Sequence, residues 1–541
     1  MKRIYWKKLL YGLLLTGLYL SGLTGCGNRE NEIEEDYGAE VESIYENHLD
    51  ISIAYWQIDN ALEGKGEDDV LMQIEQKFNV TIVPKNITWD DYYNRITLWA
   101  ETGQLPDLFV GAFRTNEMYY SWVKNGLLYE IPEDLSQYPN LEKYMDSPET
   151  ETCLVDGKRY CIFRQTYSEQ VETVKDRTIC YRWDLARKAG ITKEPETWVE
   201  FREMIQAIIR EDPEGQGIGG LTARGYAMLV GPMLTYSVPL GSTGGSIFYW
   251  VQEGDRYVPA LFAGDELGSD ALAAWQLVRD MYEEGTIEPD ITMVTVSQAE
   301  EKFLMGKSAA ICVDGGIGNT RTYENIIRYW EAEHGSSFLE DVRFLKQMPS
   351  INGETYFPMW DYAWSESYIN ANVTEEKFQR ILAIYDYLLS EEGTLLSNFG
   401  IEGVTYRIDE TGKVQRLTDE FPSDIYPSIE LFASLVCWNY GNQKADIYPQ
   451  TVPEEYVQVD VMRVEEARTC SVPQYDYDYT RVFYQMGDPF SIDINNIFLE
   501  MMINEDPVEE VWQEIIQEYE DQGLSEIIEK VNEHVKQERD W

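Results

Sequence analysis

The sequence predicts an α/β protein with two lobes, and three observations support this prediction. Helical periods and short apolar strands alternate along the chain, which is the pattern of a largely parallel sheet covered by helices. The 541 residues exceed the size at which a single hydrophobic core stops growing, about 250–300 residues. A hydrophobic content of 44% is enough to build folded cores in spite of a net charge of −52.

The expected elements follow one another at the spacing of α/β units. Several helices begin at a capping hydroxyl, as at Thr88 and Thr197, and several end at glycine, as at Gly103 and Gly285. Residues 420–490 are rich in Tyr and Pro and show fewer clear periods. The expected strands are 51–56, 80–83, 105–111 and 308–313, and the expected helices are 70–78, 88–103, 184–190, 197–208, 272–285, 297–306, 378–393 and 507–538.

The N-terminus has the features of an export signal. Four Lys and Arg side chains precede the apolar run Leu9–Leu23, which is short for a membrane-spanning helix. The run ends in Leu23-Thr24-Gly25-Cys26, which resembles the lipobox of bacterial lipoproteins. This resemblance implies a signal peptide at 1–25, diacylation of Cys26, and anchoring at the extracellular face of the cell membrane. The polar, acidic residues 26–48 are expected to form a flexible tether.

The net negative charge makes some kinds of binding partner unfavourable. Removal of residues 1–25 takes away four cationic side chains, so the net charge of −52 becomes −56. Nucleic-acid binding depends on cationic side chains that replace the counterions of phosphates, and anionic membrane surfaces attract cations for the same reason. Nucleic acid is therefore not an expected partner, and an anionic membrane surface is disfavoured.

Six cysteines remain after Cys26. An extracellular chain permits disulfides, but a fold of this size does not need them. We expect mostly buried thiols, and Cys153 and Cys161 are the one pair close enough in sequence to form a hairpin bridge. The other four are Cys180, Cys312, Cys437 and Cys470.

Motifs of common enzymes lack their required context. Gly215–Gly220 matches a dinucleotide-binding glycine pattern but follows a helix and an acidic turn instead of a strand. The three histidines are scattered and form no zinc motif. Asp361 or Glu366 with Glu402 could form a carboxylate pair for glycoside hydrolysis, but a solvated or capping role is favoured for each.

Aromatic side chains are the positive signal for a ligand. The chain holds 15 Trp, 38 Tyr and 18 Phe residues, several of them where strands end or loops turn. Sugars stack their C–H faces on aromatic rings, while their hydroxyls seek carboxylates, amides and guanidinium groups. Residues 360–364, Trp-Asp-Tyr-Ala-Trp, bring both kinds of group together. For any single Trp, a place in the core is an equally good interpretation.

Several short segments form a pattern in the order of the chain. They are Trp89–Leu108, which contains Gly103-Gln104-Leu105-Pro106-Asp107, and Asp156–Tyr160, Tyr181–Ile191, Pro195–Trp198, Phe303–Ala310, Phe399–Tyr406 and Trp512–Leu524. Together they resemble the family 1 extracellular solute-binding proteins of bacterial ABC importers, in particular the alginate-type oligosaccharide-binding lipoproteins.

The resemblance implies a two-lobed periplasmic-binding-protein-like (type II) fold with a hinge and a ligand cleft between the lobes. The first lobe would consist of 49–165 and 290–357, and the second of 166–289 and 358–541. The implied function is capture of a carbohydrate, in particular an oligosaccharide, and its delivery to ABC permease subunits, without catalysis, without a cofactor and as a monomer. The alternatives are a binding protein for a peptide or another small polar solute, and a surface-anchored glycoside hydrolase.

Candidate ligand contacts are residues after strands and in the aromatic segment. Aromatic rings would stack on sugars, whereas Asp, Gln and Arg would bind hydroxyls, and Arg114 could instead meet the carboxylate of an acidic sugar. The candidates are Trp56, Gln57 and Asp59 after the first strand, Phe113 and Arg114 after 105–111, Asp314 after 308–313, and Trp360, Asp361 and Trp364.

The resemblance also raises the question of calcium. Alginate-type relatives carry an Asp- and Asn-rich calcium loop after the Thr-Trp helix. The corresponding residues here are Asp212–Gly220, of which only Asp212, Glu214 and Gln216 offer side-chain oxygens. A cation that takes six to eight oxygens is poorly served by this set, so we expect no tight calcium site.

Overall fold

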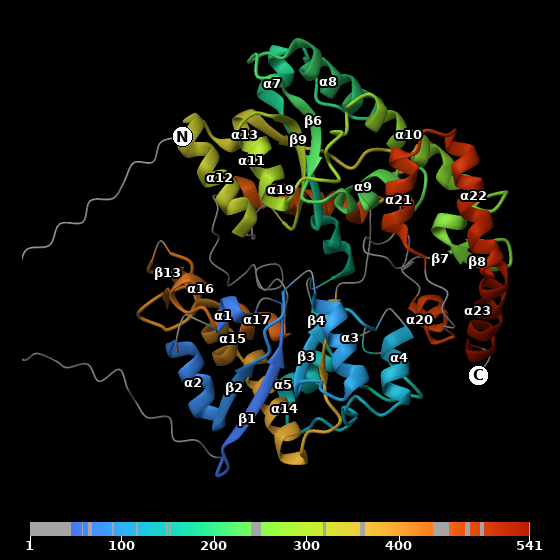
Figure 1. Ribbon diagram of the computed structural model, residues 1–541. Coiled ribbons are helices and arrows are strands. Elements are labelled where there is room, and N and C mark those ends of the chain that lie inside the picture. The colour runs from blue at the N-terminus through green and yellow to red at the C-terminus, as the bar shows by residue number, and fades with distance from the viewer. Residues whose placement is uncertain are drawn as a thin grey trace, which may run out of the picture. The chain divides into compact units, whose positions relative to one another are not determined.

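Two main sheets organise the protein, and each has its own hydrophobic core (Figure 1). No helix in the described part of the chain is both long and apolar enough to cross a membrane. The computed structural model describes residues 45–56, 58–62, 68–88, 91–114, 117–147, 150, 153–165, 167, 169–239, 250–316, 321–357, 363–418, 420–436, 454–470, 477–486 and 492–539.

The first sheet has five strands in the order β2-β1-β3-β11-β4. β1 (Leu49–Ala54) is parallel to β2 (Val80–Pro84) and to β3 (Leu108–Gly111). β11 (Ala363–Ile369) is antiparallel to both β3 and β4 (Ile162–Gln165). The C-terminal ends of β1, β3 and β4 therefore meet the N-terminal end of β11 at one edge, which we call the first strand edge.

The second sheet has four strands in the order β10-β5-β9-β6. β9 (Ser308–Asp314) is parallel to β6 (Gly219–Ala223) and antiparallel to β5 (Arg177–Arg182), which also pairs antiparallel with β10 (Val342–Phe344). The N-terminal end of β5 thus meets the C-terminal ends of β9 and β6, and we call this place the second strand edge.

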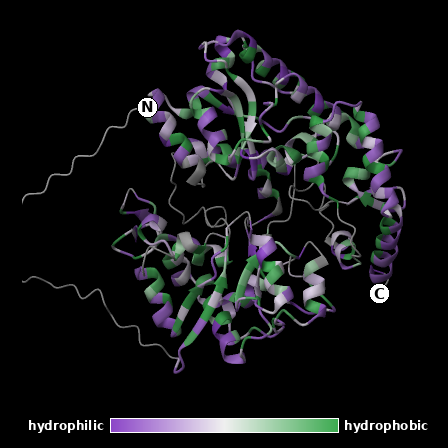
Figure 2. Ribbon diagram, in the orientation of Figure 1, coloured by the Kyte–Doolittle hydropathy of each residue, from purple (hydrophilic) through white to green (hydrophobic). Residues whose placement is uncertain are grey.

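The second sheet is buried on both faces, as its continuous apolar strands predict. Along β5, Ile179 and Tyr181 enter one core cluster and Cys180 enters another, because successive side chains point to opposite faces. The strands of both sheets are accordingly hydrophobic, whereas the covering helices are hydrophilic on their outer sides (Figure 2).

Helices from distant parts of the sequence pack on each sheet. The core of the first sheet includes α1 (Ile58–Ala61), α2 (Asp69–Phe78), α3 (Tyr92–Thr102), α4 (Glu117–Lys124), α5 (Pro139–Met145), α14 (Glu375–Leu389), α15 (Glu391–Phe399) and α17 (Ile429–Val436). The second sheet is covered by α7 (Trp183–Lys188), α8 (Trp198–Glu211), α9 (Val230–Leu234), α10 (Leu272–Glu283), α20 (Tyr477–Gln485), α21 (Ile494–Ile503), α22 (Val508–Asp521) and α23 (Leu524–Arg539), with η2 (Tyr226–Leu229) and the hairpin β7 (Trp250–Glu253) and β8 (Arg256–Pro259). A further cluster on the same sheet holds α11 (Val296–Leu304), α12 (Arg321–His334), α13 (Phe338–Asp341) and α19 (Glu454–Thr469), while α16 (Pro422–Ile425) and the hairpin β12 (Tyr406–Ile408) and β13 (Val414–Arg416) complete the first lobe.

The chain passes between the two sheets at three places, between β4 and β5, between β10 and β11, and between α17 and α19. The first connection contains the short helix η1 (Gln170–Lys175). Parts of the first two connections pack together with α19, which follows the third connection, in a small cluster that we call the hinge cluster. It contains Val174, Phe357 and Ala467, with Val171, Val464 and Cys470 packed against them.

The predicted division of the lobes is wrong for two segments. The prediction places residues 290–357 in the first lobe, but β9 and β10 pair with β5 in the second sheet. It places residues 358–541 in the second lobe, but β11, near the start of this segment, lies between β3 and β4 in the first sheet. An apolar strand can join either sheet as far as its own sequence shows, because its partners are remote in the chain.

Local boundaries also differ from expectation at three places. Tyr45 and Asn47 lie in the predicted tether but contact the first lobe, with the Arg380 guanidinium 3.8 Å from the Tyr45 ring and Asn47 donating to Glu376. The helix expected from Thr88 begins at Tyr92 with Asp91 as its cap residue. The helix expected from Ser297 is capped two residues earlier by Thr295, which forms a capping box with Gln298.

Candidate functional site

Two of the predicted aromatic contacts lie in the core of the first lobe. Trp56 and Phe113 are exposed by 2% and 0%, and Trp56 stacks on Tyr92 with ring centroids 4.6 Å apart. Both rings directly follow the C-terminal ends of parallel strands, where the chain turns back over the sheet. Because both rings are buried, they form an aromatic base on which another side chain at the first strand edge can pack.

The aromatic residue above this base is Tyr93, which sequence analysis missed. Its ring meets Trp56 edge-on at 6.2 Å and Phe113 at 5.3 Å, and 37% of the residue is exposed. Partial burial raises the pKa of Tyr93 to about 12, so its hydroxyl is neutral and able to donate. The signal that could have identified Tyr93 as a candidate contact is its position in the first turn of α3, which lies beside Trp56.

Arg114 is held by a buried ion pair at the same edge. Its Nε lies 2.7 Å from Oε1 of Glu366, and the two residues are exposed by 6% and 1%. The other oxygen of Glu366 accepts from the backbone N–H of Phe113 and of Arg114 and from the hydroxyl of Tyr368. The pair therefore fixes the loop after β3 against β11.

A second guanidinium lies deeper in the first strand edge. Arg164 in β4 is fully buried, donates to the backbone carbonyl of Ser434, and donates to the hydroxyl of Ser365 at 2.6 Å. It also lies 5.5 Å from the ring of Trp56. Arg164 thereby joins α17 and β11 to the base of the edge.

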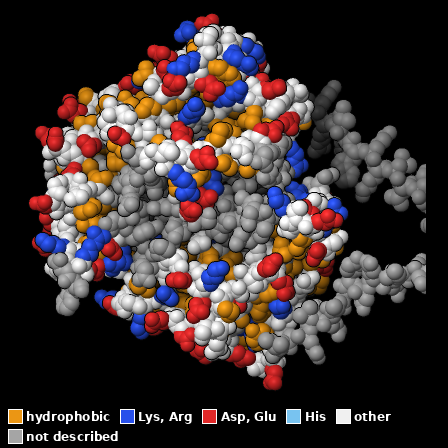
Figure 3. All heavy atoms as spheres, turned by 180° about the vertical axis from the view of Figure 1, so that it is seen from behind, with side chains coloured by type: hydrophobic (Ala, Val, Ile, Leu, Met, Phe, Trp, Pro, Cys, Tyr) orange, Lys and Arg blue, Asp and Glu red, His pale blue; other side chains and the backbone are white. Residues whose placement is uncertain are grey.

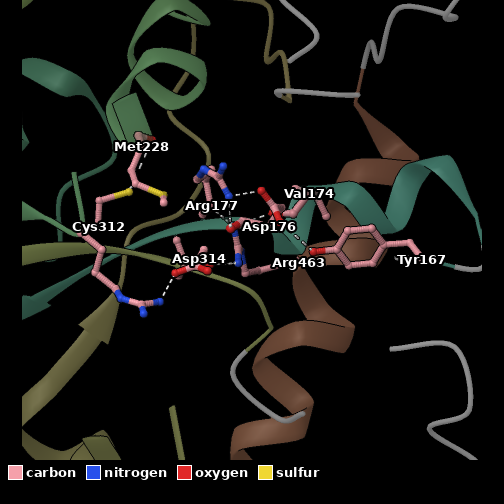
Figure 4. Close-up of polar contacts among 10 residues, drawn as sticks. Tyr167, Val174, Asp176, Arg177, Met228, Cys312, Asp314 and Arg463 are labelled. Carbon is pink, nitrogen blue, oxygen red and sulfur yellow. Dashed lines mark hydrogen bonds and ion pairs between the residues drawn. The ribbon is translucent and has the colours of Figure 1, made fainter. Parts of the chain in front are cut away.

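The second strand edge carries a network of ionised groups (Figure 4). Asp176 pairs with Arg177 and accepts from the hydroxyl of Tyr167 at 3.2 Å. Burial raises the pKa of Asp176, although the neighbouring guanidinium opposes this shift. Because Asp176 ends the first connection and Arg177 begins β5, this pair sits where the chain enters the second sheet.

Asp314 lies beside this network at the C-terminal end of β9. Its carboxylate pairs with Arg224, which follows β6 and also contacts Glu300 at 2.8 Å. The side chain of Asp314 is 41% exposed, whereas that of Arg224 is 17% exposed. Burial raises the pKa of Glu300, with Arg224 acting in the opposite direction. Asp314 therefore presents carboxylate oxygens to solvent at the second strand edge.

The other predicted contacts cannot be placed. Gln57, Trp360 and Asp361 lie outside the described residues, as does Cys26. Asp59 belongs to α1 and Trp364 to β11, but the described part of the structure does not include their side chains.

The described cysteines form no disulfide with one another. Cys153, Cys161, Cys180 and Cys312 are buried, and Cys470 is partly buried. The expectation of mostly buried thiols is confirmed for these residues, and Cys153 and Cys161 are not bridged. Cys437 lies outside the described residues.

The loop Asp212–Gly220 is held in place by hydrogen bonds within the protein. Asp212 accepts from the backbone N–H of Gln216 and of Gly217, at 3.0 and 2.9 Å. The ammonium of Lys307 donates to the carbonyl of Gln216, and that of Lys188 to Glu214, both at 2.8 Å. Among all described residues, no group of three His, Cys, Asp or Glu side chains is placed to hold a metal ion.

The two strand edges together offer an exposed aromatic ring, carboxylates and fixed guanidinium groups. This set can stack on and hydrogen-bond a polar ligand. The fold around it is matched by the profile of a family described as bacterial extracellular solute-binding protein, over residues 62–333. The chain belongs to this family. The predicted family is thus confirmed, and the family consists of binding proteins.

Comparisons with individual proteins cover most of the chain. The polygalacturonan/rhamnogalacturonan-binding protein YtcQ of Bacillus subtilis is 23% identical over 486 residues, which cover 87% of this chain and 89% of YtcQ. Lipoprotein LipO of the same organism is 23% identical over 60% of this chain and 62% of its own length. These relatives support the assignment of the full two-lobed chain to solute binding.

Solved structures confirm the predicted fold class. The alginate-binding protein AlgQ2, solved without calcium ion, matches with a TM-score of 0.69 at 14% identity, covering 92% of this chain and all of that chain. The FusA substrate-binding protein of S. pneumoniae, an EF-hand mutant in complex with fructo-nystose, has a TM-score of 0.65 at 16% identity and covers 91% of this chain and 99% of that one. The protein therefore has the two-lobed fold of periplasmic solute-binding proteins.

Proposed function

We propose that the protein captures a carbohydrate, in particular an oligosaccharide, between its two strand edges and delivers it to the transmembrane subunits of an ABC importer. The observation that carries this proposal is that the first strand edge exposes the ring of Tyr93 on a buried aromatic base, while the second strand edge exposes the carboxylate of Asp314. A ring and a carboxylate match the two faces of a sugar, its C–H surface and its hydroxyls.

The chain connectivity supports a shared site. Residues 166–176 leave β4 at the first strand edge and enter β5 at the second strand edge. This span is short, and part of it is coiled into η1, so the edges are tethered to each other. A ligand that contacts both lobes would stabilise the closed form, and a permease can distinguish that form from the open one.

The relatives support a carbohydrate as the ligand. YtcQ is named for polygalacturonan and rhamnogalacturonan, AlgQ2 for alginate, and FusA was solved with fructo-nystose. These names describe those proteins, and their shared feature is an oligomeric sugar. The proposal includes binding without chemistry, because a transported ligand is delivered unchanged.

Membrane anchoring through Cys26 is part of the proposal. The basic start, the apolar run and the sequence Leu23-Thr24-Gly25-Cys26 support cleavage and lipidation, and the relative LipO is a named lipoprotein. Metabolic labelling with a fatty-acid analogue should mark the wild type and leave Cys26→Ser unlabelled. Equal labelling of both would contradict the anchor. Sedimentation of the soluble part should give a monomer.

Calorimetry against a glycan panel, with chromatography of the same mixtures, tests the function. Micromolar binding of an oligosaccharide without new products is the expected result. Release of reducing sugar would favour the surface hydrolase instead. Heat from a peptide library, with none from any glycan, would favour the peptide-binding alternative.

A further inference from the structure

The guanidinium groups that the structure describes at the two strand edges already have partners within the protein. At the second edge, Arg177 pairs with Asp176, and Arg224 pairs with both Asp314 and Glu300. At the first edge, Arg114 pairs with Glu366. Each of these cations is thus matched by at least one carboxylate.

Three further cationic side chains among the described residues near these edges are also engaged. Arg463 of α19 donates to the hydroxyl of Thr178 and to the carbonyls of Val174 and Arg177, the latter at 2.8 and 2.9 Å. Arg164 donates to Ser434 and Ser365. Lys175 of η1 is almost fully buried and lies 3.5 Å from Glu172. These donors hold the scaffold.

We infer that the captured carbohydrate is neutral and carries no carboxylate groups. The inference rests on the proposed function and specifies its substrate class. A uronic acid binds best to a guanidinium that can offer two parallel N–H donors. To supply one here, a described guanidinium must give up a partner within the protein, and for Arg114, Arg177 and Arg224 this leaves a partly buried carboxylate without its cation, which is costly.

The exposed acceptors favour the same ligand class. Asp314 presents carboxylate oxygens, and a carboxylate accepts hydrogen bonds from sugar hydroxyls but repels another carboxylate. The charge of the rest of the protein does not offset this repulsion, because residues 26–541 have a net charge of −56. On the face shown in Figure 3, Lys and Arg side chains lie in small groups among Asp and Glu side chains. A polyanionic sugar would therefore be repelled on approach.

The test compares neutral and acidic oligosaccharides of equal length by calorimetry, at low and high salt. The neutral set contains fructo-, xylo- and galacto-oligosaccharides, and the acidic set contains oligogalacturonate and oligomannuronate. At least one neutral sugar should bind about 100-fold more tightly than any uronate, which is about 2.7 kcal/mol. Its affinity should change little with salt, because no ligand charge is screened.

Tightest binding by a uronate would overturn the neutral class and leave the proposed function intact. Binding of no sugar in either set would overturn both, so the two failures can be told apart.

A variant that lacks one carboxylate at the second strand edge tests the inference more directly. Asp314→Asn removes one carboxylate partner of Arg224, and we expect its affinity for oligogalacturonate to rise about tenfold. The control is Asp280→Asn. Arg202 of α8 contacts Asp280 of α10 and also Glu284, so it is an arginine with two carboxylate partners. Arg224 likewise has two carboxylate partners, but it lies at the second strand edge. If Asp280→Asn gained as much affinity for oligogalacturonate as Asp314→Asn, the ion pairs of the second strand edge would not be what excludes uronates.

Discussion

Nη2 of Arg463 lies 2.8 Å from the backbone carbonyl oxygen of Val174. Arg463 belongs to α19, which follows the third connection between the sheets, and Val174 belongs to the first connection. Val174 also packs with Phe357 and Ala467 in the hinge cluster. Helix α19 is therefore held to the first connection both by packing and by a hydrogen bond.

Removal of this tie should destabilise the protein. Arg463→Ala leaves the carbonyls of Val174 and Arg177 and the hydroxyl of Thr178 without their donor, and we expect a loss of about 2–3 kcal/mol. Arg468→Ala is the control on the same helix, because Arg468 pairs with Glu169 at the surface, where both side chains are at least half exposed. Its cost should stay below about 1 kcal/mol. Chemical denaturation measures both, and equal costs would contradict a structural role for Arg463.

Breaking the buried pair of Arg114 and Glu366 should cost more than breaking a surface pair. We expect Arg114→Ala to lose about 3–5 kcal/mol, because Glu366 is left as an uncompensated buried charge. Lys158→Ala breaks the half-exposed pair with Glu130 and should destabilise the protein far less than Arg114→Ala does. Thermal unfolding provides the comparison. Full stability of Arg114→Ala, combined with lost sugar binding, would restore the sequence prediction of Arg114 as a ligand contact.

Tyr93 should contribute to affinity through its ring. Tyr93→Ala is expected to weaken binding of the best sugar about tenfold, or about 1.4 kcal/mol, and Tyr93→Phe should keep most of it. Tyr329→Ala is the control, since Tyr329 is 39% exposed on α12. Calorimetry on all three variants decides the matter, and an unchanged dissociation constant for Tyr93→Ala would exclude stacking at this position.

The loop at Asp212 should be independent of metal. Its oxygens bind backbone N–H groups, and Lys307 supplies a cation from the protein itself. EDTA and added calcium should therefore leave the melting temperature unchanged, whereas Asp212→Ala should lower it, because the backbone N–H groups of Gln216 and Gly217 lose their acceptor. Glu214→Ala, which removes only the partner of Lys188, serves as the control. A fall of several degrees with EDTA would show that a metal is bound after all.

The buried carboxyl of Asp176 should give stability a measurable pH dependence. Burial raises its pKa, so the folded protein binds this proton more tightly than the unfolded chain. The resulting stabilisation is complete below about pH 3.9, the value of an unfolded Asp, and is lost as the pH rises through the higher folded pKa.

The melting temperature of the wild type relative to Asp176→Asn should thus fall as the pH rises above this value. Asp409 gives the opposite sign, because hydrogen bonds from Thr411 and from the backbone of Lys413 lower its pKa. Relative to Asp409→Asn, the wild type should gain stability as the pH rises. Parallel curves for the two pairs would contradict the assignment.

Much of the local structure was predictable because its causes lie within a few residues. The strand at 308–313 and the long C-terminal helical region reappear as β9 and as α22 with α23. Thr197 caps α8 by accepting from the N–H of Glu200, as its spacing predicts. The residues quoted for the family resemblance likewise lie in contiguous segments.

The sequence by itself determined the acidity of the chain, the α/β class and the family, and it predicts the export signal, because each depends on composition, periodicity or contiguous motifs. Only the tertiary structure decided that β9 belongs to the second sheet and β11 to the first, and that Glu366 neutralises Arg114. It also decided that Trp56 is core while Tyr93 is exposed. Strand pairing, ion pairing and burial depend on residues hundreds of positions apart, and no local pattern in one sequence specifies which of them meet.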